Sequence, residues 1–228
     1  MTLAVRLRSA VSLLGRFPAL AGVDLDVAEG EVVLVQGANG AGKTTLLRAC
    51  AGLAAFASGE AEVLGHDLRR DRKAVRRRIG LLGHATFLYD DLTVADNLRF
   101  AARAAGASAA SADEAMTALG LDGRLRDVAV AKLSAGQRRR AAVAVIVARR
   151  PDLWLLDEPH AGLDAAGRDL LDALVRGAAT RGATVVLASH ELDRAAAIAS
   201  RTVTMAGGQV IGGLLARPAP TMEPVHVA

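Results

Sequence analysis

Residues 32–47, VVLVQGANGAGKTTLL, have the types and the spacing that are needed to hold a chain of phosphates. Val32–Gln36 is apolar and β-branched, which predicts a strand buried on both faces. A glycine-rich turn follows, and Lys43 then begins an amphipathic helix. The segment therefore matches the pattern G-x-x-x-x-G-K-[ST] in the strand–loop–helix context that gives this pattern its meaning.

The chemistry of phosphate binding explains this spacing. Backbone N–H groups can wrap a phosphate only where side chains leave room, and a helix N-terminus adds free N–H groups and a positive dipole end. Lys43 is placed to reach the β- and γ-phosphates, and the Thr44 hydroxyl is placed to ligate Mg²⁺. The alternative is a plain glycine-rich loop before a core helix. The predicted phosphate-binding residues are Gly37, Ala38, Asn39, Gly40, Ala41, Gly42, Lys43, Thr44 and Thr45.

Two further groups follow predicted buried strands. Asp157 and Glu158 come after the run Asp152–Leu156, and His190 comes after Thr184–Ala188. Ligands collect at the carboxyl ends of parallel strands, so Asp157 is a candidate Mg²⁺ ligand, directly or through water, and Glu158 a candidate base for an attacking water. His190 could donate a hydrogen bond to a γ-phosphate. The alternatives are a solvated turn for the carboxylates and a surface position for the histidine.

The segment Leu133–Gln137, LSAGQ, predicts the start of a helix that continues over Arg138–Arg150. Ser134 as N-cap and Gln137 at the third helical position form a capping box. This helix N-terminus, with a hydroxyl and the nearby Gly136, is suited to an anion. Local capping alone would also account for these residues.

The other elements are expected from periodicity and turn signals. Helices are expected to begin at Thr93 and Ser111, residues 90–150 to be mostly helical, and a loose tail to begin at about residue 214. The arginine-rich residues 69–78 are expected to form a solvated helix face, with contact to anionic lipid headgroups as the alternative. Further strands are predicted at Leu3–Leu13, Gly22–Val27, Glu60–Leu64 and Ile79–Leu82, and a hairpin at Arg201–Ala206 with Gln209–Gly212.

Composition excludes several classes of protein. The 228 residues are 52% hydrophobic with a formal charge of +4, and the single cysteine, Cys50, excludes a disulfide framework and a cysteine-based zinc site. Cys50 is expected to be a small buried residue. Because the longest apolar run, Ala141–Ala148, is far too short for a membrane span and no signal peptide is evident, we expect a cytoplasmic chain. Aromatic residues make up only 3% of the chain, so no nucleic-acid partner is expected.

Together these segments resemble the ATP-binding-cassette ATPase family. GANGAGKT, LSAGQ, LWLLDEP, AGLD and SH occur in that family's order, and the resemblance covers roughly residues 3–213. It implies an α/β fold, a P-loop NTPase (RecA-like) core with a mostly parallel sheet, N-terminal antiparallel β strands and a helical subdomain at about 90–150. Residues 1–228 would form a single nucleotide-binding domain.

The resemblance also implies a mechanism. The chain would be an ATPase that uses ATP and Mg²⁺, and two copies would close head-to-tail as a homodimer. The residues Ser134, Gly136 and Gln137 of one copy would meet the γ-phosphate held by Gly37–Thr44 of the other, and Asp164 would couple the two sites. The dimer would energise a separate integral membrane permease. The chain would then lie peripherally on the cytoplasmic face of the cell membrane.

Three positions depart from the family pattern. His84 stands where the family usually has Gln, at a position associated with Mg²⁺, water and the membrane subunit. Ala135 replaces the second glycine of LSGGQ. The aromatic residue that commonly stacks on adenine has no clear match, since Leu14 lies near its place and Phe17 is the only aromatic residue nearby.

Four stretches, GLLGH (80–84), LYDDLTVADNLRF (88–100), LSAGQRRR (133–140) and LWLLDEP (153–159), are similar to the ATP-binding subunit of the haem exporter of cytochrome c maturation. The alternatives are an exporter of drugs, lipids or polysaccharide precursors, a soluble ATPase acting on ribosomes or DNA, and a regulatory module without turnover. The presence of Glu158 counts against the last. Residues 87–89, FLY, could receive a short helix of the permease, or could pack locally under the helical region.

Overall fold

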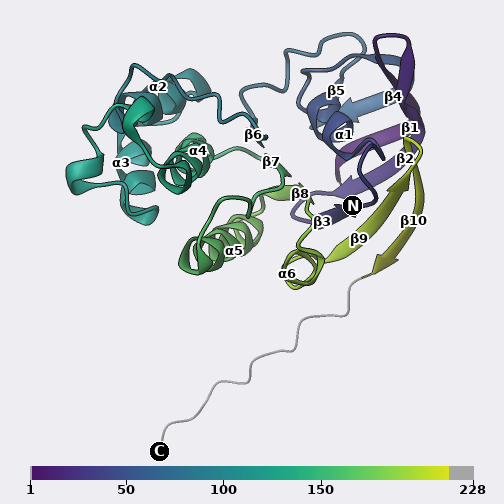
Figure 1. The fold of residues 1–228 in the computed structure, drawn as a ribbon. Helices are drawn as coiled ribbons and strands as arrows, with labels where there is room; N and C mark the ends of the chain where they lie inside the picture. Colours follow the sequence, from purple (N-terminus) through teal and green to yellow (C-terminus); the bar gives the residue numbers. More distant parts are fainter. Residues whose placement is uncertain (1, 216–228) are drawn as a thin grey trace, which may run out of the picture.

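The computed structural model describes residues 2–215, which form two β-sheets and a group of helices (Figure 1). The strands are β1 (Leu3–Leu14), β2 (Phe17–Ala28), β3 (Val32–Gln36), β4 (Phe56–Val63), β5 (His66–Asp67), β6 (Ile79–Leu82), β7 (Leu153–Asp157), β8 (Thr184–Ala188), β9 (Arg201–Ala206) and β10 (Gln209–Leu215). The helices are α1 (Lys43–Cys50), α2 (Val94–Ala105), α3 (Ala109–Ala118), α4 (Ala135–Arg149), α5 (Ala165–Thr180) and α6 (Leu192–Ala196), with short 3₁₀ turns at Gly123–Leu125 and Val130–Lys132.

The larger sheet has the strand order β10-β9-β3-β8-β7-β6. All neighbouring pairs in it are parallel except the hairpin of β9 and β10. The strands β3, β7 and β8 are buried along almost their whole length, as expected for parallel strands that are covered on both faces. Because their carboxyl ends lie at one edge of the sheet, the loops after Gln36, Asp157 and Ala188 are brought together.

The smaller sheet is antiparallel, with the strand order β2-β1-β4-β5. Its apolar residues share one hydrophobic core with α1 and with one face of the larger sheet, for example Leu7, Leu46 and Val35. The predicted α/β architecture, with N-terminal antiparallel strands and a mostly parallel core sheet, is therefore confirmed.

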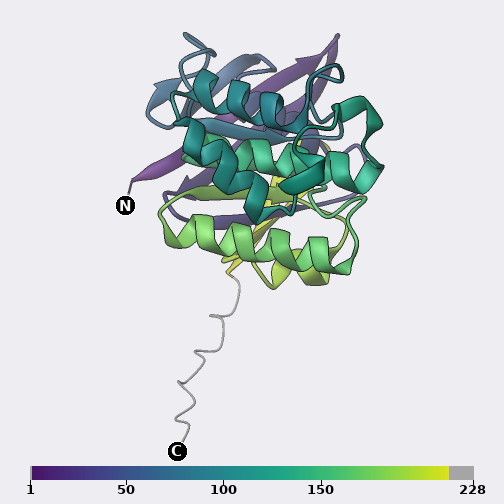
Figure 2. The ribbon, with the colours of Figure 1, turned by 90° about the vertical axis from the view of Figure 1, so that its left-hand side faces the viewer.

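The helices α2, α3 and α4 lie together beside the sheets and form a second hydrophobic core, in which Leu98, Met116 and Ile146 are almost completely buried. In Figure 2 the helices of residues 94–180 face the viewer and the sheets lie behind them. Within residues 2–215, none of the helices combines the length and the apolar character that a membrane span requires.

The predicted capping box of α4 is confirmed. Ser134 Oγ accepts a hydrogen bond from Gln137 N, and the Gln137 side chain accepts one from Ser134 N. At the start of α2, Thr93 Oγ1 likewise caps Asp96 N, but the shorter Asp96 carboxylate bonds the Thr93 hydroxyl and not the Thr93 backbone N–H. Of these two helix starts, that of α4 is a complete box and that of α2 is not.

One expected helix start and one expected helix were wrong. The helix α3 begins at Ala109 with Ser108 as its N-cap, and Ser111 lies buried inside it, where its hydroxyl donates to Ser108 O. Residues 69–78 form turns and no helix. The carboxylates of Asp67 and Asp71 accept hydrogen bonds from backbone N–H groups two residues further on, a local pattern that competes with the helix.

Three strand ends also differ from the sequence expectation. The strands β2 and β4 begin at Phe17 and Phe56, earlier than predicted, because an irregular register opposite β1, with Gly59 at a φ of 81°, hides the alternation of side chains. Leu214 and Leu215, which we expected in a loose tail, pair with β9. The rest of that expected tail, residues 216–228, lies outside the described residues.

Candidate functional site

A cleft of about 400 Å³ lies at the carboxyl ends of β3, β7 and β8. We call it the phosphate-loop cleft. It gathers most of the site residues expected from the sequence, although they are up to 151 positions apart (190 − 39 = 151). Its lining residues are Leu14, Ala19, Asn39, Gly40, Ala41, Gly42, Lys43, Thr44, Thr45, His84, Asp157, Glu158 and His190.

The loop before α1 has the backbone that a phosphate cradle requires. A Cβ atom on Gly37 would lie 2.2 Å from the Met205 carbonyl oxygen, whereas one on Gly40, with a φ of 79°, would meet nothing within 4 Å. Gly37 and Ala38 form the rear of the loop, where both of their carbonyls accept hydrogen bonds from Lys43 Nζ, at 2.6 and 3.1 Å. An open glycine surface, a helix N-terminus and a buried ammonium group are suited to an anionic phosphate chain.

Thr44 and Asp157 supply adjacent oxygen atoms in this cleft. Thr44 Oγ1 donates a hydrogen bond to Asp157 Oδ2 at 2.7 Å, across 113 positions of sequence. A hydroxyl oxygen and a carboxylate are hard donors, which is the set that Mg²⁺ takes from proteins when phosphates and water complete its shell. The residues present therefore fit the expected metal.

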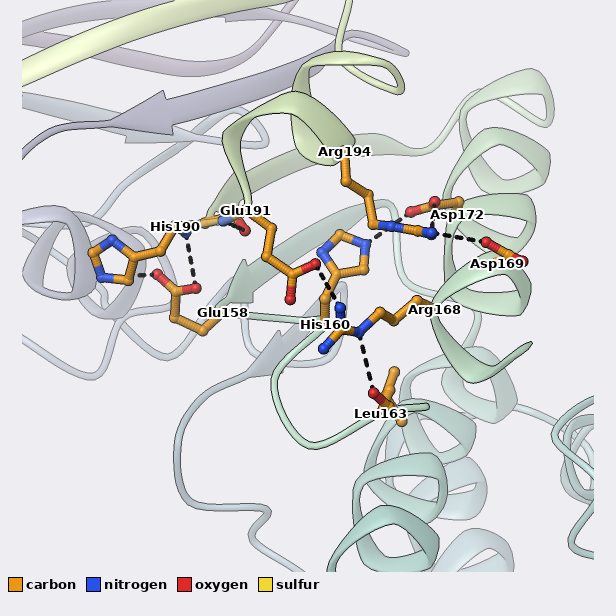
Figure 3. Close-up of polar contacts among 10 residues, drawn as sticks. Glu158, His160, Leu163, Arg168, Asp169, Asp172, His190, Glu191 and Arg194 are labelled. Carbon is orange, nitrogen blue, oxygen red and sulfur yellow. Dashed lines mark hydrogen bonds and ion pairs between the residues drawn. The ribbon is translucent and has the colours of Figure 1, made fainter. Parts of the chain in front are cut away.

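Glu158 and His190 lie side by side above the sheet edge (Figure 3). His190 N donates to Glu158 Oε2 at 3.0 Å, and His190 Nε2 lies 3.4 Å from Glu158 Oε1. The Glu158 backbone has a φ of 47°, an uncommon conformation for a residue with a side chain. Its N–H is fixed by the Ala188 carbonyl at 2.8 Å, so the turn directs this carboxylate toward the histidine.

Arg139 is a residue of this site that the sequence analysis missed. Its guanidinium, on α4, donates to the carbonyls of Gly83, Asp157 and Glu158, at 2.7, 3.2 and 2.5 Å. Burial lowers the pKa of Arg139, and the nearby carboxylates of Asp157 and Glu158 oppose this effect. Helical spacing could have indicated that Arg139 is buried, since it shares one face of α4 with positions 142, 143 and 146, which are also buried.

The LSAGQ segment (Leu133–Gln137) lies outside the phosphate-loop cleft. Ser134 is exposed at the N-terminus of α4, and Gln137 completes its capping box. A Cβ atom on Gly136 would lie 3.3 Å from the Gly162 carbonyl, so this segment packs against the loop after Glu158. Asp164 caps α5 by accepting a hydrogen bond from Gly167 N at 2.8 Å. Within one chain, these residues do not join the other site residues.

His84 and Leu14 both line the cleft, whereas Phe17 does not. Leu14 keeps 74% of its surface exposed there, and Phe17 keeps 80% exposed outside it. Leu14, which lies near the place expected for the family's aromatic residue, thus lines the cleft with an aliphatic side chain.

A second cleft, of about 400 Å³, lies between the end of α1, β6 and the helices α2 and α4. We call it the apolar groove. Leu88 packs on the core, while Phe87 and Tyr89 are 64% and 54% exposed. Tyr89 stacks edge-on against Phe100 with ring centres 5.4 Å apart, and buried Asn97 bonds both the N–H and the carbonyl of Tyr89. These contacts fix the backbone of Tyr89, while the side chains of Phe87 and Tyr89 line the groove and stay exposed.

Comparison with known proteins gives consistent results. A family model described as "ABC transporter" matches residues 20–161. The chain is 39% identical to the cytochrome c biogenesis ATP-binding export protein CcmA of Bordetella bronchiseptica, over 90% of this chain and 94% of that protein. It is 36% identical to ATP-binding cassette sub-family A member 7 of Rattus norvegicus, over 85% of this chain and only 9% of that much longer protein.

Solved structures agree in fold. A dimeric ATP-binding cassette, MJ0796, in a post-hydrolysis state bound to ADP and Pi, superposes with a TM-score of 0.85 at 26% identity, covering 93% of this chain and 99% of that one. The ATP-binding subunit of another ABC transporter superposes with a TM-score of 0.86 at 26% identity, covering 94% and 90% of the two chains.

Proposed function

Since the chain belongs to the ABC transporter family of ATPases, we propose that it energises a separate membrane permease of an exporter, and that this exporter moves haem for cytochrome c biogenesis. Residues 1–228 would form one nucleotide-binding domain, placed at the cytoplasmic face of the membrane by its permease. The observation that carries the ATPase mechanism is the gathering of Lys43, the Thr44–Asp157 pair and the Glu158–His190 pair in one cleft.

Each residue has a role in the proposed hydrolysis. Lys43 and the N–H groups of its loop bind the β- and γ-phosphates. Glu158 holds the attacking water and takes its proton, and His190 donates a hydrogen bond toward the γ-phosphate. Thr44 and Asp157 would hold Mg²⁺, and His84 lines the same cleft. The metal neutralises charge on the phosphate oxygens when it is bound.

The metal assignment can be tested separately from nucleotide binding. Thr44→Val keeps the shape of the side chain and removes the hydroxyl, so it should raise the Mg²⁺ concentration that gives half-maximal ATPase activity by about tenfold or more. Binding of a fluorescent ATP analogue in EDTA should stay within about twofold of wild type. Thr180→Val is the matched control, because its hydroxyl donates within α5 to Arg176 O and Thr180 does not line the phosphate-loop cleft. An unchanged Mg²⁺ requirement in Thr44→Val would contradict the assignment.

The position of the LSAGQ segment supports a homodimer. Ser134, Gly136 and Gln137 lie outside the cleft of their own chain, so they can meet a γ-phosphate only in a second copy. The related cassette MJ0796 is described as dimeric. Glu158→Gln, which binds ATP but cannot deprotonate water, should run as a dimer with ATP and Mg²⁺ in light scattering and as a monomer with ADP. Glu114→Gln, the same substitution at an exposed ion pair with Arg150, should stay monomeric. A monomeric Glu158→Gln with ATP would overturn this scheme.

The apolar groove is where we propose that the permease docks. Its exposed Phe87 and Tyr89 are suited to receive an amphipathic helix. The groove is also close in sequence to the phosphate-loop cleft, because His84 lines that cleft and the preceding Gly83 accepts a hydrogen bond from Arg139. The double variant Phe87→Ala, Tyr89→Ala should keep basal ATPase activity and lose stimulation by the permease. Ile211→Ala, which removes an equally exposed side chain from β10, should keep both. Full stimulation of the double variant would exclude this docking site.

A role in cytochrome c biogenesis is supported by the names of several relatives at 38–39% identity, which are described as cytochrome c biogenesis ATP-binding export proteins. Haem as the cargo is supported by the resemblance of GLLGH and LSAGQ to the haem-exporter subgroup. A strain lacking this gene should lose haem-stained c-type cytochromes, and wild-type protein but not Glu158→Gln should restore them. If c-type cytochromes persist in the deletion strain, the assignment of haem as the cargo is wrong. The cargo would then be sought among drugs, lipids and polysaccharide precursors.

A further inference from the structure

A buried polar network lies directly behind the Glu158–His190 pair. His160 is only 1% exposed, and its Nε2 lies 2.8 Å from Asp172 Oδ1 on α5. The second oxygen of Asp172 accepts a hydrogen bond from Arg194 Nη1 on α6 at 2.6 Å. Arg194 also bonds Asp169 Oδ1, at 2.9 Å. Figure 3 shows His160 between the Glu158 side of the loop and these α5 and α6 residues.

A second bridge runs parallel to this network. Arg168, on α5, donates to the Leu163 carbonyl through Nε and to Glu191 Oε2 through Nη1, both at 3.1 Å. Glu191 follows His190 directly. The loop 158–164 and the segment 189–194 are therefore connected twice through α5, once by His160 and once by Arg168.

The hydrogen bonds assign the protonation of His160. Asp172 accepts from Arg194 with its other oxygen, and as a carboxylate it can only accept from His160, so Nε2 of His160 carries a proton. Nδ1 of His160 is buried without a hydrogen-bond partner within the described residues. Nε2 of His160 is thus the donor that joins the loop 158–164 to α5.

We propose that His160 is a positioning residue, which fixes the loop 158–164 against α5 and α6 and thereby sets the relative placement of Glu158 and His190. Glu158 is two residues before His160, and His190 is four residues before Arg194, so the two ends of the network lie next to the two members of the pair. Glu158 has the strained backbone described above, and this conformation needs such external support. The inference rests on the proposed function, in which Glu158 acts on water.

The test compares two replacements of His160. His160→Gln keeps an N–H donor at similar reach to Asp172, whereas His160→Leu fills the space without a donor. His160→Leu should lower kcat for ATP by about tenfold or more, because small displacements of catalytic groups are costly. Its KM should stay within about twofold of wild type, since the phosphate loop is untouched. His160→Gln should recover kcat to within about threefold of wild type.

Activity is expressed per nucleotide-binding site, measured with a fluorescent ATP analogue, so that a loss of folded protein does not count as a loss of kcat. If His160→Leu does not fold, Asp172→Asn serves instead, because its amide cannot accept from both His160 and Arg194. Wild-type kcat per site in the variant that folds, or an equal kcat loss in His160→Gln and His160→Leu, overturns the proposal. Failure of the proposed function is distinct, since wild-type protein would then hydrolyse no ATP.

Discussion

Nη2 of Arg139, on α4, lies 2.5 Å from the backbone carbonyl oxygen of Glu158, at the end of β7. The same guanidinium bonds Gly83, the residue before His84. The buried guanidinium of Arg139 therefore connects α4 to two loops of the phosphate-loop cleft. A rotation of α4 relative to the core sheet would change these hydrogen bonds, including the one at Glu158.

Arg139→Met tests this relationship. It removes the donors from three carbonyls and leaves an apolar chain in the same space, so we expect kcat for ATP to fall at least about tenfold. The free energy of unfolding should fall by about 1–3 kcal/mol, because polar groups lose their partners. Arg140→Met, the same change one residue further on, is the control and should keep near-normal kcat. Wild-type turnover in Arg139→Met, measured by phosphate release, would contradict the role.

Gly37 and Gly40 should respond differently to the same substitution. In Gly37→Ala the new Cβ would meet the Met205 carbonyl at 2.2 Å, so the free energy of unfolding in urea should fall by about 1–3 kcal/mol. In Gly40→Ala the Cβ meets no protein atom, and only the left-handed backbone costs about 1 kcal/mol. That Cβ would instead stand where phosphate must approach, so ATP affinity should fall about tenfold or more. Normal ATP affinity in Gly40→Ala would show that the loop binds its ligand elsewhere.

The thiol of Cys50 should be inert in the native protein. Burial raises its pKa to about 12, so almost no thiolate is present at pH 8, and the thiolate is the reactive form. A disulfide reagent should label Cys50 slowly in buffer and rapidly in urea. Rapid labelling of the folded chain would mean that α1 opens more easily than its burial indicates.

The same thiol should make stability depend on alkaline pH. The pKa of Cys50 in the folded chain lies above the unfolded value of about 8.5. The stability that the neutral thiol contributes is therefore complete below about pH 8.5 and is lost as the pH rises toward 12. The difference in unfolding free energy between wild type and Cys50→Ala, which has no titrating group here, should therefore shrink between pH 8 and pH 10. A difference that does not change with pH would contradict this linkage.

The carboxylate of Asp26 should make the free energy of unfolding depend on acidic pH, and here stability is lost as the pH falls. The hydrogen bond from Arg8, at 2.7 Å to each carboxylate oxygen, lowers the pKa of Asp26. Its stabilisation is present above the unfolded pKa of about 3.9 and is lost as pH falls through the lower folded value. The stability gap between wild type and Asp26→Asn should close below about pH 4. The gap is expected to be small and to shrink in high salt, because both side chains are nearly half exposed.

The sequence by itself determined the elements whose signals are local. The strands β3, β6 and β8 and the start of α1 lie where apolar runs and the glycine-rich turn place them, and the capping box of α4 follows from Ser134 and Gln137 alone. These features depend on neighbouring residues in the chain, so composition and spacing suffice to predict them. The family, too, follows from motifs that are read locally.

Tertiary structure alone decided which of these residues meet. The strand order brings Thr44 to Asp157 and His190 to Glu158, and it leaves the LSAGQ segment outside the cleft. It also gives Arg139 and His160 their buried partners, which lie on other elements. Helical spacing indicates that Arg139 is buried, but it does not indicate which groups Arg139 contacts. Residues 69–78 form turns because the Asp67 and Asp71 side chains compete for the backbone there. The physical reason is common to all of these cases: a hydrogen bond or contact between distant residues depends on the packing of the whole chain, which no local pattern encodes.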